Sequence, residues 1–580
     1  MKHQNPVLSF EFATSEGSIR PLTFQNPVKV YKAHSIEEVL PALELVQAEI
    51  QKGFYAAGFI TYESAPAFDP AFKVRGGSTM PLLWFGIFES PQIESISSSG
   101  TYHLTEWIPL VERTEFDSAI HSIKNSIEMG ETYQTNYTIR MVSQFQGDNV
   151  AYFESLKRAQ TSNYSAYIHT GEHTILSASP ELFFRLEGNE LTTRPMKGTV
   201  KRGNFTEEDK ANASRLYHSE KDRAENVMIV DLLRNDLGMI AETGSVKVSK
   251  LFEIEQYPTV HQMTSTITAK VGEDTQISDI LKALFPCGSI TGAPKVSTMD
   301  IIANLETTPR EAYCGAIGFI TPNKEAVFNV PIRTVLIEEK TGKAVYGVGG
   351  GITWDSTSDG EYDEVLAKAR ILKEKRPEFQ LLESLLISEG HYILLDEHLD
   401  RLENSAQYFN YLYNRINIKE SLQNLVHTTT LNKAKVRLLL GKDGKVKFDV
   451  QPLTIFEPNQ SIILAREPID KNNPFLYHKT TNREIYLHFQ RMKPPEAFDV
   501  LLWNEDEELT EFTNGNVVLE MDNGLWTPPI QSGLLAGTFR ERLIKNGKIQ
   551  VKTLKISDLK KCTKIWFINS VREWVEVNLI

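Results

Sequence analysis

Cysteine is scarce in this chain. The three cysteines among its 580 residues are Cys287, Cys314 and Cys562, and no two of them form a CxxC pair. Such a sparse, odd-numbered set argues against a disulfide framework and against a structural zinc site. It is typical of proteins in a reducing compartment. We therefore expect a cytoplasmic protein.

Long apolar runs and excess positive charge are also lacking. No stretch approaches the roughly 18 uncharged apolar residues that indicate a membrane-spanning helix. No signal-like apolar segment follows Met1. The net charge of −13 argues against nucleic acid as the main partner. We expect neither a membrane nor a nucleic acid as a partner.

The composition is that of a globular protein, with 41% hydrophobic and 24% charged residues. A chain of 580 residues is too long for one hydrophobic core. A polar helical pattern begins at Glu361 and should be broken by Pro377, after which the pattern of strands and helices restarts. We therefore predict two domains, 1–376 and 377–580.

Hydrophobic periodicity predicts a mixture of strands and helices in both domains. In the first domain we expect a helix from Asp222 to Leu237 that stops at Gly238, and one continuous strand over Ala326–Leu336. In the second, Val436–Leu440 and Lys445–Val450 should form a hairpin, because Asp443-Gly444 suits the turn between them.

The densest charged region of the chain adjoins an apolar run. Lys197 lies in a Pro-x-Lys-Gly turn, and the charged segment Lys221–Glu225 leads directly into Val227–Val230. Charges so close to apolar residues are difficult to place on an ordinary solvated face. They indicate a buried polar site, where a carboxylate needs a metal ion or another cation as its partner.

Several motifs of the first domain follow one another in a distinctive order: Ser179–Phe183, Arg194–Thr199, Lys221–Gly238, Phe285–Lys295, Tyr313–Gly318, Ile332–Thr334, Gly349–Ile352 and Glu361–Glu364. This order resembles that in chorismate-utilising enzymes. The resemblance spans roughly residues 115–375 and implies a large two-sheet α/β sandwich. Within the family, anthranilate synthases carry alanine at the position of Lys197, so this chain resembles the aminodeoxychorismate synthase branch, which aminates chorismate to 4-amino-4-deoxychorismate.

The resemblance implies that Lys197 is a nucleophile and Glu181 a general acid/base. A lysine with an ordinary pKa is almost fully protonated at neutral pH, so Lys197 needs desolvation or cationic neighbours. Arg194 and Lys201 are candidates for such neighbours. Without the resemblance, a lysine in a surface turn would be the simpler interpretation of Lys197.

The resemblance also implies a magnesium ion and a set of chorismate contacts. Glu225 and Glu364 match the family's metal ligands, and Glu361, one helical turn from Glu364, is a further candidate. Alternatively, Glu361 and Glu364 are solvent-facing helix charges. The candidate substrate-binding residues are Gly198, Thr199, Tyr313, Arg333, Gly349, Gly350 and Gly351.

The second domain contains its own series of motifs: Phe379–Ser384, His398–Ala406, His478–Arg483, Leu509–Asn516, Thr527–Pro529, Gly533–Arg540 and Asn569–Arg572. In these motifs it resembles the fold-type IV pyridoxal phosphate (PLP) enzymes, which include aminodeoxychorismate lyases and aminotransferases. This resemblance implies a smaller α+β domain in which Lys479 binds PLP covalently and Glu511 pairs with the pyridinium nitrogen. Arg401 and Thr538 would hold the phosphate; alternatively, Arg401 pairs with a neighbouring glutamate on its helix.

Together the two resemblances predict a bifunctional α+β enzyme of 4-aminobenzoate synthesis. The first domain would aminate chorismate, and the second would eliminate pyruvate. No cysteine has the Gly-x-Cys-x-Gly setting of a glutaminase, so a separate glutamine amidotransferase subunit should supply ammonia. A homodimer through the PLP domain is suggested as well. The alternatives are a second domain that acts as an aminotransferase, or one that is an inactive scaffold.

Overall fold

The computed structural model describes residues 5–374, 376–453, 459–522 and 524–580. Its contacts divide the chain into two units. The first unit contains residues 1–201 and 213–376, and the second contains residues 202–212 and 377–580. Over the described ranges, no helix has both the length and the apolar character needed to cross a membrane.

Two large sheets form the first unit, each with 10 strands. In the first sheet β6 and β7 pair with β8, and in the second β14 pairs with β15. The first sheet contains, in spatial order, β16 (Gly292–Ala293), β8 (Gln134–Gly147), β20 (Lys343–Ile352), β19 (Thr334–Glu338), β10 (His173–Ser179), β9 (Tyr164–His169), β1 (Val7–Ala13) and β2 (Ile19–Gln25), with β6 (Tyr102–Leu104) and β7 (Ile108–Pro109) at β8. The second contains β13 (Met196–Lys201), β15 (Val260–Lys270), β12 (Glu190–Arg194), β11 (Leu182–Glu187), β18 (Ala326–Asn329), β17 (Ala316–Ile320), β4 (Tyr55–Ile60), β5 (Leu83–Phe88) and β3 (Lys29–Ala33), with β14 (Lys247–Gln256) at β15.

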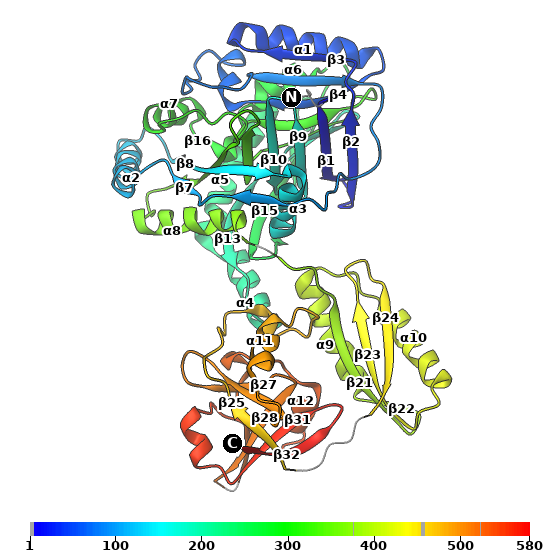
Figure 1. Ribbon diagram of the computed structural model, residues 1–580. Helices are drawn as coiled ribbons and strands as arrows, with labels where there is room; N and C mark the ends of the chain where they lie inside the picture. Colours follow the sequence, from blue (N-terminus) through cyan, green and yellow to red (C-terminus); the bar gives the residue numbers. More distant parts are fainter. Residues whose placement is uncertain (1–4, 375, 454–458, 523) are drawn as a thin grey trace. The chain divides into compact units, whose positions relative to one another are not determined.

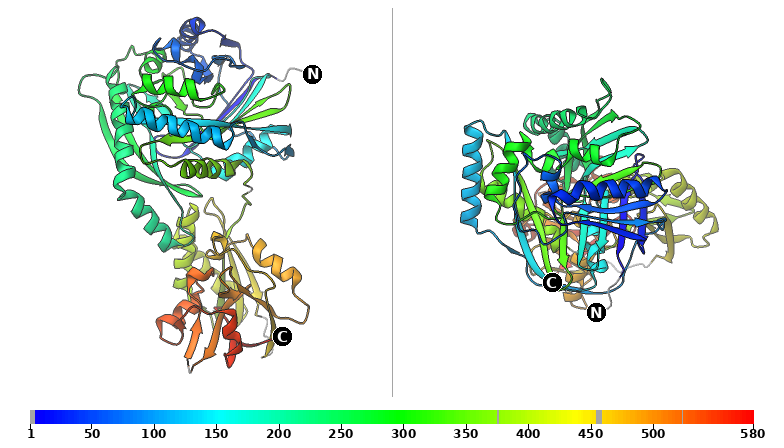
Figure 2. Two further views of the ribbon diagram at one scale, coloured as in Figure 1. Left: turned by 90° about the vertical axis from the view of Figure 1, so that its left-hand side faces the viewer. Right: turned by 90° about the horizontal axis from the view of Figure 1, so that it is seen from above.

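The two sheets pack face to face, and helices cover their outer faces (Figures 1 and 2). Side chains of both sheets meet in one apolar cluster, in which the rings of Phe10 and Phe319 lie 5.4 Å apart. This arrangement confirms the predicted two-sheet sandwich. Helices α1 (Ile36–Gln51), α5 (Glu220–Gly238) and α6 (Ile277–Leu284) cover the second sheet, and α2 (Arg113–Glu128), α3 (Asn149–Gln160) and α8 (Ser358–Ala369) cover the first.

Helix α5 contains the predicted helix and starts slightly earlier. Ser219 caps it, since its hydroxyl accepts a hydrogen bond from the backbone N–H of Asp222. Its buried residues Asn226, Ile229, Val230 and Leu233 follow helical spacing and face strands β13 and β15. The helix therefore holds its charged first turn next to the strand that carries Lys197.

The segment Ala326–Leu336 is not one strand, as the sequence pattern predicted. Strand β18 belongs to the second sheet and β19 to the first, so the chain changes sheets between them. Pro331 cannot donate a hydrogen bond to a sheet, and Arg333 adopts a left-handed backbone with φ of 53°. These two residues break the apolar run.

The second unit contains a small sheet and a larger one. In the small sheet, β22 (His391–Ile393), β21 (Leu381–Ser388), β23 (Lys433–Leu440) and β24 (Val446–Pro452) lie in that order. Helices α9 (Leu395–Phe409) and α10 (Arg415–Thr428) pack on it through one apolar cluster (Figure 1). Antiparallel pairing of β23 with β24, with Gly444 at φ of 80°, confirms the predicted hairpin.

The larger sheet has 8 strands, and β27 also pairs with β28, which joins its central strands into a closed ring. Helices α11 (Glu484–Met492) and α12 (Thr538–Lys545) accompany it. Its order is β27 (Leu509–Phe512), β26 (Asp499–Trp503), β25 (Gln460–Leu464), β32 (Glu573–Leu579), β31 (Lys564–Asn569), β28 (Gly515–Met521), β29 (Gly524–Thr527) and β30 (Gln550–Val551).

Candidate active sites

Lys197 is a half-buried residue of β13 in the first unit. Asn226 of α5 donates a hydrogen bond to its carbonyl (3.4 Å) and accepts one from Ser265 (2.6 Å), which fixes the strand against the helix. Burial lowers the pKa of Lys197; the carboxylate of Glu225 opposes this, and the ammonium of Lys368 adds to it. The structure thus provides the desolvated lysine that nucleophilic chemistry requires.

The basic residue whose charge lowers the pKa of Lys197 is Lys368, and not Arg194 or Lys201, the two basic residues that the sequence suggested beside a magnesium ion. Arg194 forms an ion pair with Glu255 at 2.6 Å. Lys368 of α8 instead donates a hydrogen bond to the Gly349 carbonyl (2.8 Å) and contributes positive charge near Lys197. Lys368 lies on a polar helix, where the sequence offered no signal for this role.

Glu181 is a buried carboxyl group between β10 and β11, only 3% exposed. Burial raises its pKa to about 7, against the effect of a 2.6 Å hydrogen bond from the Ser289 hydroxyl and the positive charge of Lys197. A carboxyl group with this pKa can hold and release a proton near neutral pH. The charges of Glu181 and Lys197 also influence each other's pKa, so the two groups share one electrostatic environment.

Two glycines of β20 allow the charged side chains to approach the strand. A Cβ atom added to Gly351 would lie 2.1 Å from Gln134 Nε2 and 2.5 Å from Lys197 Nζ, so both side chains would have to move. A Cβ atom on Gly350 would lie 3.2 Å from Glu361 Oε2 and 3.5 Å from Glu364 Oε1. The glycine run therefore brings β13, β20 and α8 together around one polar region.

The three candidate metal ligands lie on two helices. Burial, together with the charge of Glu364, raises the pKa of both Glu225 and Glu361. Glu364 is exposed; despite partial desolvation its pKa is lowered by Lys368, 2.7 Å away. In the parts of the chain that the structure describes, no three His, Cys, Asp or Glu side chains are grouped as metal ligands. The three carboxylates thus repel one another without forming a closed cage.

Gln134 is a buried residue of the site that sequence analysis did not identify. It is 0% exposed at the start of β8, and neither its amide nitrogen nor its amide oxygen has a hydrogen-bond partner within the described ranges. The amide nitrogen lies beside the position that a Cβ of Gly351 would occupy, next to Lys197. An unpaired buried amide is costly, so a polar ligand at this point would be stabilised.

Gly198 and Thr199 are held by Gln262 of β15. The amide of Gln262 donates to the Gly198 carbonyl (2.8 Å), and its oxygen accepts from the Thr199 hydroxyl (2.9 Å). Gly198 has φ of 91°, which favours glycine. Both residues therefore shape the turn around Lys197.

Tyr313 precedes β17, and Arg333 lies between β18 and β19. The Arg140 guanidinium lies 5.2 Å from the centre of the Tyr313 ring, and both residues line a cavity of about 20 Å³ with Gly347. Arg333 is half-buried at the crossover between the sheets, where burial lowers its pKa. None of the contacts described here links either residue to Lys197, so their substrate-binding roles stay predictions.

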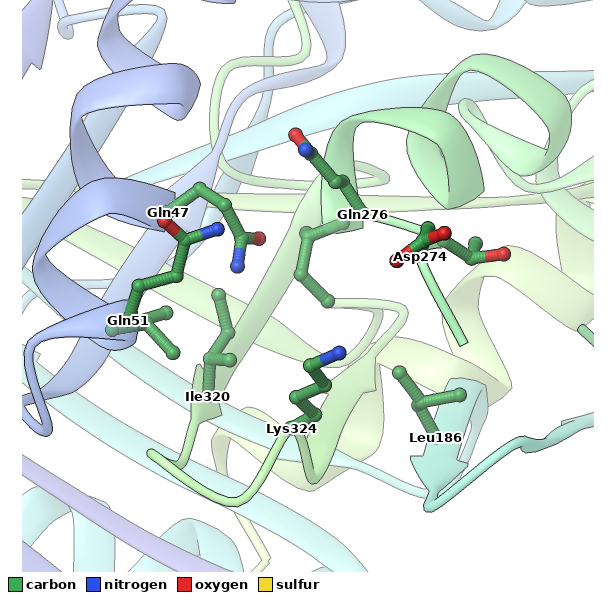
Figure 3. A pocket seen from close by; sticks show the side chains of 10 residues that line it. Gln47, Gln51, Leu186, Asp274, Gln276, Ile320 and Lys324 are labelled. Carbon is green, nitrogen blue, oxygen red and sulfur yellow. The ribbon is translucent and has the colours of Figure 1, made fainter. Parts of the chain in front are cut away.

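A larger cavity of about 320 Å³ contains none of the predicted site residues. It lies between α1, the start of α6 and the loop after β17 (Figure 3). Gln47, Gln51, Asp274, Gln276 and Lys324 contribute polar side chains to its wall. Since no candidate nucleophile or acid/base reaches it, we do not assign the chemistry to this cavity.

Lys479 of the second unit follows a short helical turn, Pro474–Leu476, and is half-buried. Its carbonyl accepts a hydrogen bond from Leu382 N (2.9 Å), which anchors the segment to β21. Burial lowers the pKa of Lys479 to about 7, and the nearby charges of Arg401 and Arg483 act in the same direction. At neutral pH a large fraction of this amine is therefore unprotonated.

Glu511 of β27 is 4% exposed. Tyr486 donates a hydrogen bond to its Oε1 (2.7 Å), and Asn516 donates one to its Oε2 (3.3 Å). Burial nevertheless raises its pKa to about 8. Such a carboxyl group favours a cationic hydrogen-bond partner, which a protonated ring nitrogen would provide.

Arg401 of α9 pairs with Glu383 of β21, and not with Glu397 or Glu403 of its own helix. The guanidinium donates to both carboxylate oxygens (2.9 and 2.7 Å) and to the carbonyl of Ala536 (3.1 Å). Together with His398, Arg401 keeps the pKa of the buried Glu383 at about 2, although burial opposes this. Three of the five guanidinium N–H groups are occupied, so two can still bind an anion.

Thr538 begins α12, and its hydroxyl lies 3.3 Å from His398 Nε2. The backbone N–H groups of the first helical turn have no partner within the helix and favour an anion. Gly537 precedes Thr538, and a Cβ there would collide with the side chain of Asn516. Glu511, Asn516 and the start of α12 thus belong to one continuous polar site.

Known proteins match both units. The chain matches the family described as chorismate binding enzyme over residues 90–374 and the family described as amino-transferase class IV over residues 380–580. It is 42% identical over 267 residues to aminodeoxychorismate synthase component 1 of Salmonella typhimurium, covering 46% of this chain and 58% of the relative. The chain spans about three fifths, 58 to 61%, of three such components.

Anthranilate synthases are also similar. Component 1 from Methanothermobacter marburgensis is 36% identical over 340 residues, covering 54% of this chain and 73% of the relative. The crystal structure of component I from Streptococcus pneumoniae has a TM-score of 0.52 and 25% identity, covering 64% of this chain and 91% of that one. Overall similarity alone therefore does not distinguish the two reactions.

Proposed function

We propose that this chain, which belongs to the family of chorismate binding enzymes and carries a class IV aminotransferase domain, makes 4-aminobenzoate from chorismate and ammonia in two steps. The first unit would form 4-amino-4-deoxychorismate. The second would convert this intermediate to 4-aminobenzoate and pyruvate. The residues around Lys197 and Lys479 support the two steps.

The observation that carries the first step is the environment of Lys197. Anthranilate synthases, by the resemblance, have alanine at this position, whereas here a desolvated lysine lies beside Glu181, Glu225 and Gly351. Its amine would attack the ring as the 4-hydroxyl leaves, and ammonia would then add at C4 and displace the lysine. While the lysine is bonded to the ring, the position that it occupies is blocked, so the ammonia nitrogen adds at C4.

Glu181 supplies the proton that the first step needs. Its pKa of about 7 means that it is partly protonated at neutral pH. The 4-hydroxyl is a poor leaving group unless it departs as water, and Glu181 would protonate it. The Ser289 hydroxyl, which donates to Glu181, fixes the orientation of the carboxyl group.

Glu225 and Glu364 are the residues that would hold a magnesium ion. Magnesium keeps several waters and needs only one or two protein carboxylates, so a closed cage of three is not required. Burial raises the pKa of Glu225 and Glu361 although the charge of Lys197 opposes this at both, so further positive charge beside them would be favourable. When bound, the ion supplies positive charge for a carboxylate of the substrate.

Glu225→Gln and Glu364→Gln should each raise the magnesium concentration needed for half-maximal chorismate consumption, on the order of tenfold or more. Each change removes one anionic ligand. The measurement is chorismate consumption against magnesium concentration. Glu220→Gln, at the exposed start of α5, serves as the control and should behave as the wild type. An unchanged magnesium dependence in both variants would show that these carboxylates do not bind the ion.

The second unit has a donor set that fits PLP. Glu511 would bind the ring nitrogen, Arg401 and the first turn of α12 would bind the phosphate, and Lys479 would hold the aldehyde carbon. When bound, PLP supplies an electron sink for bond cleavage at the carbon that bears the amine. Lys479 would move the C4 proton, because its pKa of about 7 suits a base at neutral pH.

Ammonia should come from a separate glutamine amidotransferase. Burial raises the pKa of Cys287 to about 12 and that of Cys314 to about 11, and it also raises the pKa of Cys562. Thiols of this kind are poor nucleophiles. The cysteines therefore offer no glutaminase site, in agreement with their sequence context.

Incubating the purified chain with chorismate, magnesium, PLP and ammonium should yield 4-aminobenzoate and pyruvate. Glutamine in place of ammonium should yield neither. The measurement is product identification by mass spectrometry. Anthranilate as the product would exclude C4 amination. If 4-amino-4-deoxychorismate accumulated instead, the second unit would be an aminotransferase or an inactive scaffold, the two alternatives to a lyase.

A further inference from the structure

The second unit includes a short segment that is far from it in sequence. Residues 202–212 cluster with residues 377–580, although they directly follow β13 and precede α5 of the first unit. The class IV family match begins only at residue 380. The segment is therefore an addition to the matched domain.

A buried ion pair gives the segment a fixed shape. Arg202 and Asp209 are each 6% exposed, and the guanidinium donates two hydrogen bonds to the carboxylate (2.6 and 2.8 Å). The backbone N–H of Gly203 donates to the same carboxylate (2.9 Å), and a Cβ on Gly203 would collide with the backbone of Asp209. Breaking such a pair from one side leaves a buried charge uncompensated.

The segment is attached to α9 and to the apolar core beside it. Arg202 donates a hydrogen bond to the Tyr408 carbonyl (2.9 Å), and its guanidinium lies 4.3 Å from the centre of the Tyr408 ring. The Tyr408 hydroxyl donates to the Gly203 carbonyl (2.8 Å). Phe205 packs against a buried cluster, with its ring 5.5 Å from that of Tyr477.

A series of direct contacts connects Arg202 to His478, the residue before Lys479. The ring of Tyr408 lies 4.1 Å from the ring of His478. His478 Nδ1 also lies 3.0 Å from the Ser405 hydroxyl. Burial lowers the pKa of His478 to about 3, and the charge of Arg202 acts in the same direction. His478 is thus a neutral ring between Tyr408 and Ser405.

Helix α9 connects these contacts to Arg401, the residue that is proposed to bind the phosphate of PLP. Arg401, Ser405 and Tyr408 are spaced by four and three residues, so they share one face of the helix. Contacts of residues 202–212 with the end of α9 therefore act on the face that also carries Arg401.

We propose that residues 202–212 are a structural part of the class IV unit, and that Arg202 is a positioning residue for Lys479 through Tyr408 and His478. The inference rests on the proposed binding of PLP at Lys479. It assigns a role at the PLP-binding site to residues 202–212, which lie outside the class IV family match.

Full-length Arg202→Gln should bind PLP more weakly than the wild type, on the order of tenfold, because the supports of Tyr408 and His478 are lost. Arg215→Gln, an exposed arginine of helix α4 (Thr206–Tyr217), removes the same charge outside the segment and should have no effect. Equilibrium dialysis measures the affinity for PLP, and circular dichroism checks folding.

The protonation of the lysine-bound cofactor gives a second readout. Its visible absorption band should titrate about half a pH unit higher in Arg202→Gln, since the positive charge that acts on His478, next to Lys479, is removed while the opposing carboxylate of Asp209 remains. Arg202→Lys should restore this midpoint but not the full affinity, because it keeps the charge and loses the planar fork. The charged groups that act on Lys479 itself are Arg401, Arg483, Glu383 and Glu511, and they remain in every variant.

If Arg202→Gln is unstable, Phe205→Ala and Tyr408→Phe test the same contacts more mildly, and both should weaken PLP binding. Wild-type affinity and midpoint in Arg202→Gln and in these two variants would overturn the proposal. Absence of lysine-bound PLP in the wild-type chain would instead refute the proposed function, and the inference with it.

Discussion

Lys479→Ala should abolish covalent binding of PLP and stop pyruvate release, while chorismate continues to be consumed. With a pKa of about 7, the amine of Lys479 is well suited to attack an aldehyde at neutral pH. The same side chain is the proposed base at C4, so pyruvate formation should fall at least about a thousandfold. 4-Amino-4-deoxychorismate should accumulate. Coupled detection of pyruvate and mass spectrometry of the products measure both effects.

Lys447→Ala is a suitable control for this prediction, because Lys447 is exposed on β24 and belongs to neither site. It should leave both activities unchanged. Borohydride reduction of the wild type followed by peptide mapping locates the modified lysine. A pyridoxyl group on any other lysine would refute the assignment of Lys479 and, with it, that of Glu511.

Lys197→Ala should depress formation of 4-amino-4-deoxychorismate by at least about a hundredfold, because it removes the amine that is proposed to form the covalent adduct. The second unit should still convert 4-amino-4-deoxychorismate that is added to the mixture. Any residual amination should shift toward C2, since alanine at this position is what the anthranilate synthases carry. Product analysis by mass spectrometry distinguishes anthranilate from 4-aminobenzoate.

Lys247→Ala, an exposed lysine at the start of β14, is the matched control for Lys197→Ala. It should keep wild-type turnover and the wild-type product. Unchanged C4 amination in Lys197→Ala would remove Lys197 from the mechanism, and Glu181 would then require another nucleophile as its partner.

The fold was largely predictable where apolar residues recur with one clear period. Helix α5 and the β23–β24 hairpin follow from helical spacing and from Asp443-Gly444. The run Ala326–Leu336 misled the prediction, because both of its halves are buried strands and only the short stretch 330–333, which contains Pro331 and Arg333, separates them. Periodicity cannot show that a chain changes sheets within an apolar run.

The site was predictable only where a motif marked it. Lys197, Glu181 and Glu225 were identified by their resemblance to a family, and the structure brings them near one another. Gln134 and Lys368 were missed, because a glutamine in a strand and a lysine on a polar helix have ordinary local sequences. Their importance depends on tertiary contacts with β20, which no local pattern encodes.

The division of the chain at residues 202–212 has a consequence for genetics. A gene split at codon 377 would separate the two matched families, yet the second product would lack a segment that belongs to its unit. The first product would retain that segment without the α9 residues that bind it. After fission of this gene, the contacts of residues 202–212 with Tyr408 and Tyr477 would be lost from the second product. The two proposed chemistries are separated at residue 377. The polypeptide cannot simply be divided at that residue, because residues 202–212 belong to the second unit.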